Sequence, residues 1–193
     1  MRLLHLDSSA LGAGSVTREL TAAIVARWQD TVPGLDVAYR DLDAQPLPHL
    51  TGPVLGKADP AVAAESERVL QLFLDADVVV VGAPMYNFGI PSTLKAWIDR
   101  IAVAGRTFRY TEQGPEGLAG GKRVIVASGR GGAYGDASPA DFQEAYLRQV
   151  FGFLGVRDLE FVRAEGVAIS PERRSEALAA AHAAVPAPLP LAA

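Results

Sequence analysis

Val78-Val79-Val80-Val81, bounded by Asp77 and Gly82, is the clearest strand in the chain. Four consecutive β-branched residues favour an extended backbone, and the glycine after them favours a turn. A continuous apolar run without polar alternation is typical of a strand that is buried on both faces of a sheet. We therefore expect a layered α/β protein built around this strand.

The segments on either side of this strand alternate between strand and helix. Further strands are predicted at residues 3–6, 35–39, 123–127 and 157–162. Helices are predicted at residues 15–29, 60–75, 91–104, 140–154 and 171–184. The first helix repeats Val16, Leu20, Ile24 and Trp28 at i, i+4 spacing, and Ser15 is its expected N-cap. Residues 41–59 and 105–121 are rich in proline and glycine and are predicted to be long loops.

Strands that alternate with helices predict a parallel, doubly wound sheet with helices on both faces. The five predicted strands suit a flavodoxin-like sheet of order 2-1-3-4-5 and are too few for a six-stranded dinucleotide fold. The 193 residues show no internal repeat, so residues 1–184 are expected to form one domain. Residues 185–193, rich in proline and alanine, are expected to be a flexible tail.

The composition leaves few reactive side chains. The chain has no cysteine, which excludes thiol nucleophiles and cysteine-based metal sites, and its three histidines are too scattered for a metal site. We expect His5 to be a hydrogen-bonded core residue. The net charge of −4 argues against binding to nucleic acid or anionic membranes. No apolar run is long enough to span a bilayer, so a cytoplasmic protein is expected. An enzyme with this inventory would depend on a bound cofactor.

Ligands of such sheets bind beyond the carboxyl ends of the strands, where the strand order reverses. The relevant loops follow the first, third and fourth strands. The first, residues 7–17, carries four hydroxyls and two glycines before a helix start, which suits a phosphate group. It lacks the lysine of a Walker loop, and Thr17 stands where a G-x-G-x-x-G motif has its third glycine. An ordinary capping loop explains the same residues equally well.

The other two loops suit a flat ligand and a close backbone approach. Residues 83–91 bring Met85, Tyr86, Asn87 and Phe88 to the end of the Val78 strand, and aromatic and thioether groups pack on ring faces. The alternative is that Tyr86 and Phe88 cap the core. Residues 128–135 are rich in glycine, which lets a backbone approach a ligand or simply makes a loop flexible. Three ligand-suited loops at the three expected positions favour a binding site.

Several motifs of the chain resemble one known family. They are residues 84–88 (PMYNF), 107–112 (TFRYTE), 114–118 (GPEGL), 130–132 (RGG) and 164–166 (AEG). Together they resemble the FMN-dependent NADH-azoreductases, which are also quinone reductases and have a flavodoxin-like fold. The resemblance runs from residue 3 to about residue 171.

This resemblance implies one non-covalent FMN per subunit and names its contacts. The implied cofactor-binding residues are Ser9, Ser15, Val16, Thr17, Met85, Tyr86, Asn87, Phe88, Gly129, Arg130, Gly131 and Gly132. Thr17 replaces a serine of the family but keeps the hydroxyl. Gly129 replaces another serine, and Ser128 is an alternative source of that hydroxyl. Tyr110 matches a residue near the mouth of the family's active site and is expected to wall the substrate pocket.

The activity implied by the resemblance is hydride transfer from NADH to FMN and then to a quinone, in ping-pong order. Reductive cleavage of aromatic azo compounds to amines, and a homodimer, are implied as well. The chemistry is expected at the flavin N5, with no catalytic side chain and no metal. Two alternatives stay open. A flavodoxin-type electron carrier would not need the long loops at 41–59 and 105–121, and a nucleotide- or phosphate-binding protein without flavin would not need the aromatic segment 85–88.

Overall fold

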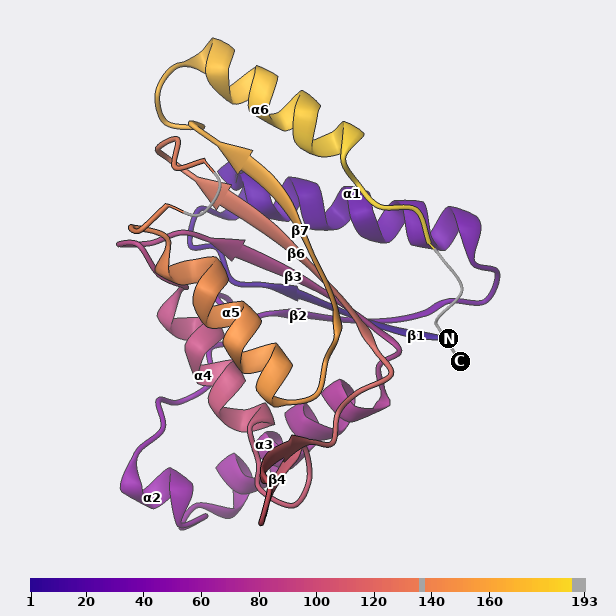
Figure 1. Ribbon diagram of the computed structural model, residues 1–193, viewed down its shortest axis with the longest axis vertical. Helices are drawn as coiled ribbons and strands as arrows, with labels where there is room; N and C mark the ends of the chain where they lie inside the picture. Colours follow the sequence, from indigo (N-terminus) through magenta and orange to yellow (C-terminus); the bar gives the residue numbers. More distant parts are fainter. Residues whose placement is uncertain (136–137, 189–193) are drawn as a thin grey trace.

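The computed structural model describes residues 1–135 and 138–188 of the chain. Its centre is a parallel sheet of order β2-β1-β3-β6-β7 (Figure 1). The strands are β1 (Arg2–Asp7), β2 (Asp36–Asp41), β3 (Val78–Pro84), β6 (Arg123–Arg130) and β7 (Asp158–Glu165). In order of their appearance this is 2-1-3-4-5, so the predicted doubly wound fold and strand order are confirmed.

Helices cover both faces of this sheet (Figure 1). One face carries α1 (Val16–Thr31) and α6 (Pro171–Ala183). The other carries α3 (Pro60–Asp75), α4 (Ser92–Ile101) and α5 (Phe142–Phe153). These helices match the five predicted segments to within a few residues at each end.

The valines of β3 are divided between two hydrophobic cores. Val78 and Val80 pack with Trp28 of α1, whereas Val79 and Val81 pack with Trp97 of α4 on the opposite face. All four valines are fully buried. Because successive side chains of a strand point to opposite faces, a strand between two helical layers must be apolar at every position.

The two long loops contain short elements that the sequence analysis did not predict. The 105–121 segment forms an antiparallel hairpin of β4 (Phe108–Thr111) and β5 (Gly114–Gly117), and α2 (Gly52–Leu55) interrupts the 41–59 segment. A 3-10 turn, η1 (Gly12–Gly14), lies before α1. The prediction of plain loops was wrong at these places. The hairpin residues are mostly exposed, so they lack the apolar pattern that reveals a buried strand.

The chain stays attached to the sheet layers beyond α6. Val185 is buried, and its carbonyl accepts a hydrogen bond from Arg27 Nη1 at 2.8 Å. Arg123 Nη1 donates to the carbonyl of Ala187 at 3.2 Å. The rest of the expected tail, residues 189–193, lies outside the described residues.

Two kinds of feature, a membrane-spanning helix and a metal-binding cluster of side chains, are absent from the described residues. None of the helices within residues 1–135 and 138–188 is long and apolar enough to cross a membrane. The same residues contain no cluster of three or more acidic or histidine side chains that could hold a metal ion.

Candidate functional site

A pocket of about 280 Å³ opens at the carboxyl edge of the sheet. The loops expected from the sequence meet there, together with the segment after β7 and the first turns of α6. Its lining residues are Ser9, Leu11, Ser15, Val16, Thr17, Pro84, Met85, Tyr86, Gly129, Gly131, Val167, Ala168 and Arg174.

The first wall of the pocket is the start of α1. Ser15 caps this helix, with its Oγ accepting from Arg18 N at 3.3 Å, and the same Oγ lies 3.1 Å from Thr17 Oγ1. The first N–H groups of a helix have no intrahelical acceptor. Among the described residues, the N–H groups of Val16 and Thr17 have no partner. Free N–H groups, two hydroxyls and the positive end of the helix dipole form a site for an anion.

Tyr86 ties the loop after β3 to the loop after β1. Its hydroxyl lies 3.3 Å from Ser9 Oγ and accepts a hydrogen bond from Ala10 N at 3.1 Å. The hydroxyl therefore holds residues 7–17, which we call the anion loop, in position. The Tyr86 ring and Met85 form the apolar side of the pocket.

The chain turns back directly after Tyr86 in an unusual conformation. Asn87 and Phe88 have φ values of 49° and 70°, and Tyr86 and Gly89 exchange two backbone hydrogen bonds of 3.0 Å around them. Positive φ is uncommon for asparagine and a genuine outlier for phenylalanine, and such conformations concentrate at functional sites. Both side chains are exposed, and neither lines the pocket of this chain.

The end of β6 brings bare backbone to the pocket through glycines. A Cβ at Gly129 would lie 2.9 Å from Thr17 Cγ2, and a Cβ at Gly131 would lie 3.3 Å from the Cβ of Ala168. A larger side chain at Gly129 would collide with the helix start that forms the anion site. Both of these predicted residues line the pocket, and both positions suit glycine because a side chain there would crowd the neighbouring residues.

Arg130 and Ser128 point to the other face of the sheet, since side chains alternate along a strand. Ser128 Oγ is fully buried and donates to Gln143 Oε1 at 2.9 Å, so it does not supply the pocket with a hydroxyl. Arg130 is 1% exposed and binds three carboxylates, those of Asp141, Glu144 and Glu165, at 2.6–2.8 Å. Gly132 does not line the pocket either, and its carbonyl accepts from Gly166 N at 2.9 Å.

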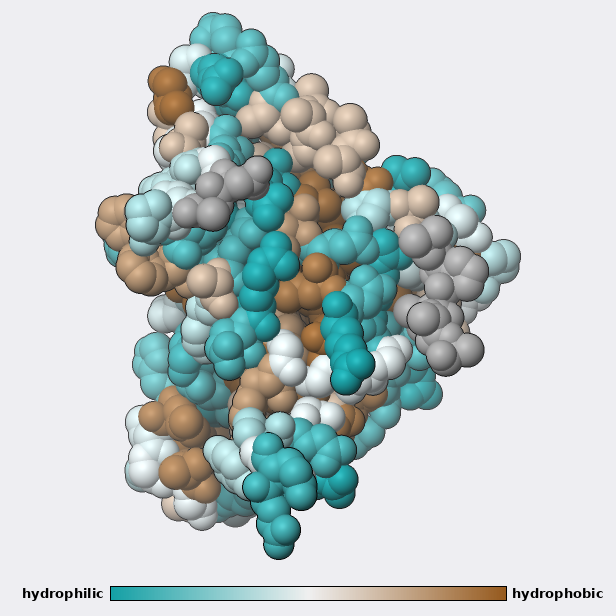
Figure 2. Space-filling view, in the orientation of Figure 1, coloured by the Kyte–Doolittle hydropathy of each residue, from teal (hydrophilic) through white to brown (hydrophobic). Residues whose placement is uncertain are grey.

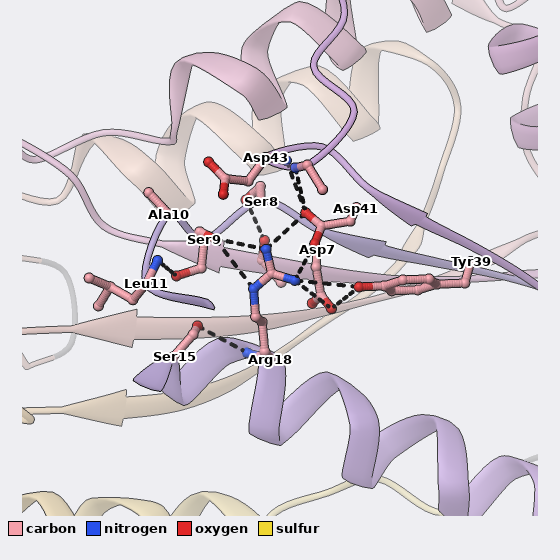
Figure 3. Close-up of polar contacts among 12 residues, drawn as sticks. Asp7, Ser8, Ser9, Ala10, Leu11, Ser15, Arg18, Tyr39, Asp41 and Asp43 are labelled. Carbon is pink, nitrogen blue, oxygen red and sulfur yellow. Dashed lines mark hydrogen bonds and ion pairs between the residues drawn. The ribbon is translucent and has the colours of Figure 1, made fainter. Parts of the chain in front are cut away.

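Arg18 braces the anion loop from below (Figure 3). Its Nε and Nη2 donate to the carbonyl of Ser9 at 3.3 and 2.9 Å, and its two Nη atoms hold Asp41 at 2.6 and 2.8 Å. The hydrogen bond from Arg18 holds the pKa of Asp41 below its ordinary value. The charge of Arg18 is thereby neutralised inside the protein and is not offered to a ligand.

Asp7 completes this network at the end of β1. Its carboxylate accepts from Thr21 Oγ1 at 2.8 Å and from the Tyr39 hydroxyl at 3.1 Å. Burial acts to raise the pKa of Asp7, but these partners and the adjacent His5 ring outweigh it and lower the pKa. His5 is buried as expected, but it is not hydrogen-bonded at Nε2. That atom lies 3.6 Å from Asp7 Oδ2, within range of an ion pair, and has no hydrogen-bond partner within the described chain.

Tyr110 lies on the hairpin and not beside the pocket of this chain. It is 76% exposed and packs edge-on against Phe108 with a centroid distance of 5.6 Å. Sequence reasoning also missed the contribution of the segment after β7, where Val167, Ala168 and Arg174 line the pocket. No local signal marks these residues. Val167 N and Ala168 N are brought to the pocket by hydrogen bonds to the carbonyls of Arg130 and Gly131, and Arg174 by the packing of α6 beside α1.

Comparison with known proteins gives the site its context. The family described as having a flavodoxin-like fold matches residues 1–187. A protein of Xanthomonas axonopodis pv. citri, named FMN-dependent NADH:quinone oxidoreductase 1, is 68% identical over 95% of this chain and 94% of its own length. The FMN-dependent NADH:quinone oxidoreductase of Stenotrophomonas maltophilia is 65% identical over 96% of this chain and 95% of its own.

Solved structures agree with these relatives. An azoreductase from Bacillus anthracis strain Sterne superposes with a TM-score of 0.86 at 30% identity, covering 96% of both chains. An FMN-dependent NADH-azoreductase from Bacillus anthracis strain Ames Ancestor, solved in complex with FMN, gives a TM-score of 0.84 at 27% identity, again over 96% of both chains. From the family match and these relatives, the chain belongs to the flavodoxin-like family of FMN-dependent NADH:quinone oxidoreductases.

Proposed function

We propose that this protein is an FMN-dependent NADH:quinone oxidoreductase. The observation that carries the proposal is the pocket itself, which joins an anion site at the start of α1 to an apolar wall of Met85 and Tyr86. A flavin mononucleotide has the same two parts, a phosphate and a flat ring system. The names of relatives that are 65–68% identical support the same activity.

The residues of the pocket fit this cofactor. The N–H groups of Val16 and Thr17 and the hydroxyls of Ser9, Ser15 and Thr17 would hold the phosphate. The bare backbone at Gly129 and Gly131 leaves room for the chain that joins phosphate and ring. The volume of about 280 Å³ lies just below the usual range for pockets that enclose a whole ligand. The open side of the flavin would therefore face the nicotinamide and the acceptor.

Bound FMN would supply, at its N5 atom, the two-electron chemistry that the side chains lack. The protein binds and orients, and we assign no side chain as a catalytic acid or base. NADH and the quinone would use the same open face in turn, which gives ping-pong kinetics. The balance is one NADH and one proton for each quinone reduced to a hydroquinone.

Reductive azo cleavage is the second activity that we propose. Breaking an aromatic N=N bond to two amines takes four electrons and four protons, so two NADH and two protons are consumed for each azo bond. The azoreductase names of the structural relatives support this extension. The same open face would serve, because an aromatic azo compound has a flat conjugated ring system, as a quinone has.

We propose that the protein forms a homodimer and that the second subunit completes the site. We also propose a cytoplasmic location. Hydrophobic surface gathers over the region of α2, where Leu50 and Leu55 are exposed (Figure 2). An exposed apolar patch of this kind suits a protein interface. In a dimer, Tyr110 would wall the substrate pocket of the partner subunit, since it lies away from the pocket of its own chain.

The proposal is tested on the purified protein in two steps. It should be yellow or take up added FMN, and it should then oxidise NADH rapidly when p-benzoquinone is added, with parallel double-reciprocal plots. With a monoazo dye, two NADH should disappear for each dye molecule. A colourless protein that fails to take up FMN contradicts the proposal. FMN binding without quinone-dependent NADH oxidation would favour the electron carrier.

A further inference from the structure

The anion end of the pocket is built almost wholly from neutral donors. Hydroxyls and backbone N–H groups of Ser9 and residues 15–17 surround it, and Arg18 beneath it is held by Asp41. Among the described residues that line the pocket, Arg174 is the one charged side chain. It comes from the first turn of α6, which lies beside α1 in Figure 1.

Arg174 contacts the anion loop although the two are far apart in the sequence. Its Nη2 donates to the carbonyl of Gly14 at 3.1 Å, across 160 positions of sequence. Gly14 directly precedes Ser15, the N-cap of α1, and Arg174 lines the same pocket as Val16 and Thr17, the residues with free N–H groups. A guanidinium carries five N–H donors, and this contact occupies one of them.

The charge of Arg174 is available to a ligand. Within the described chain no carboxylate lies within 4.0 Å of it, whereas the neighbouring Arg173 is paired with Glu176 at 3.2 Å. Arg174 is half-buried at the rim of the pocket, and Arg173 is exposed and outside it. An arginine fork suits a phosphate because its parallel N–H groups match two phosphate oxygens.

We infer that Arg174 binds the phosphate of FMN and makes the pocket select phosphorylated flavin over riboflavin. This inference rests on the proposed function. A phosphate monoester carries a charge near −2 at neutral pH, and a helix N-terminus supplies only about +0.5. Arg174 supplies the full positive charge that the neutral loop lacks. It also links α6 to the loop, so that a bound phosphate would join α1, the loop and α6.

The test compares flavin affinities of the apoprotein by quenching of flavin fluorescence. Three proteins are needed: wild type, Arg174→Ala, and Arg173→Ala as a matched control that removes an adjacent arginine outside the pocket. We expect Arg174→Ala to weaken FMN binding roughly tenfold to a hundredfold and to change riboflavin binding less than twofold. The FMN affinity of the variant should also depend less on salt. Arg173→Ala should match wild type with both flavins.

The outcomes separate this inference from the proposed function. Equal weakening of FMN and riboflavin by Arg174→Ala would mean that Arg174 only props the loop through Gly14, and it would overturn the inference. Unchanged FMN affinity would overturn it as well, while the proposed function stood. A wild-type protein that binds neither flavin would overturn the proposed function first. Riboflavin binding by the variant serves as its own check that the pocket is folded.

Discussion

At the scale of single residues, Arg130 shows how a strand divides its side chains between a ligand and the core. It sits in a motif that suggests cofactor contact, but its guanidinium is buried among three carboxylates from α5, β7 and the turn before α5. A buried arginine of this kind holds elements together, and removing it leaves unpaired charges in a medium that solvates them poorly.

We therefore expect Arg130→Met to lower the free energy of unfolding by about 3–5 kcal/mol. Urea denaturation measures the change, and FMN affinity is measured on the folded variant. The control is Arg173→Met, which removes an exposed ion pair worth at most about 1 kcal/mol. A variant of normal stability that has lost FMN affinity would instead place the Arg130 side chain in the cofactor site.

At the scale of elements, the hairpin is fixed to the body of the protein by two glycines. A Cβ on Gly117, the last residue of β5, would lie 2.1 Å from the backbone nitrogen of Gly155. Gly155 follows the C-cap of α5 and has a φ of 94°, a conformation that favours glycine. The hairpin and the end of α5 therefore touch backbone to backbone.

The variant Gly117→Ala should force these two elements apart and destabilise the protein by about 1–3 kcal/mol. The natural control is Gly152→Ala, also near the end of α5, where an added Cβ would meet nothing within 4 Å. That change should stabilise the protein by about 0.5–1 kcal/mol, because alanine has a higher helix propensity than glycine. Thermal unfolding of both variants gives the comparison, and equal melting temperatures would refute the close contact.

Elements with a strong local pattern are those that the sequence predicts correctly. Burial gives an element a recognisable sequence pattern. The strand Val78–Pro84 has a continuous apolar run, and the helix with Leu94, Trp97 and Ile98 has an apolar stripe at helical spacing. The hairpin at 108–117 is not predicted because most of its residues face solvent and have no apolar pattern. The four-residue α2 is too short for a periodic pattern.

The candidate site divides in the same way. The helix start at Ser15 and the aromatic segment at Met85 and Tyr86 are visible in the sequence because they are contiguous. The place of Arg174 in the site cannot be predicted from the sequence, because its contact with Gly14 forms only when α6 packs beside α1. Side chains alternate along a strand, so Arg130 points away from the pocket while Gly129 and Gly131 line it. The sequence does not reveal which face each residue takes, because every residue of β6 is buried.

At the scale of the whole molecule, arginine–carboxylate pairs link neighbouring layers and set the response to acid. Glu65 of α3 binds Arg68 on its own helix and the buried Arg40 of β2, and the pKa of Glu65 is lowered to about 2. A carboxyl group with a lowered pKa stabilises the folded state above the ordinary pKa near 4.5. That contribution is lost as the pH falls from about 4.5 to about 2.

Glu65→Gln should therefore reduce stability at pH 7 by roughly 1 kcal/mol, a modest effect because the side chain is one-third exposed and screened by solvent. The difference from wild type should shrink as the pH falls towards 2. Denaturation midpoints from pH 7 to pH 2 provide the measurement. Glu67→Gln, which removes a more exposed pair with Arg106, is the control and should have a smaller effect. A constant difference at every pH would contradict this account.

The position of β3 at the middle of the sheet also bears on how the molecule opens. Its backbone is hydrogen-bonded to β1 on one side and to β6 on the other, and its valines lie between the two cores. We therefore expect amide hydrogens there to exchange with solvent only when the whole domain unfolds, and those of α2 and the hairpin to exchange through local opening. The carboxyl end of β3, which carries Pro84 into the pocket, should therefore be among the last parts of the domain to open. A protein in which α2 and the hairpin had opened would still keep the strand after which the Met85 and Tyr86 segment of the site follows.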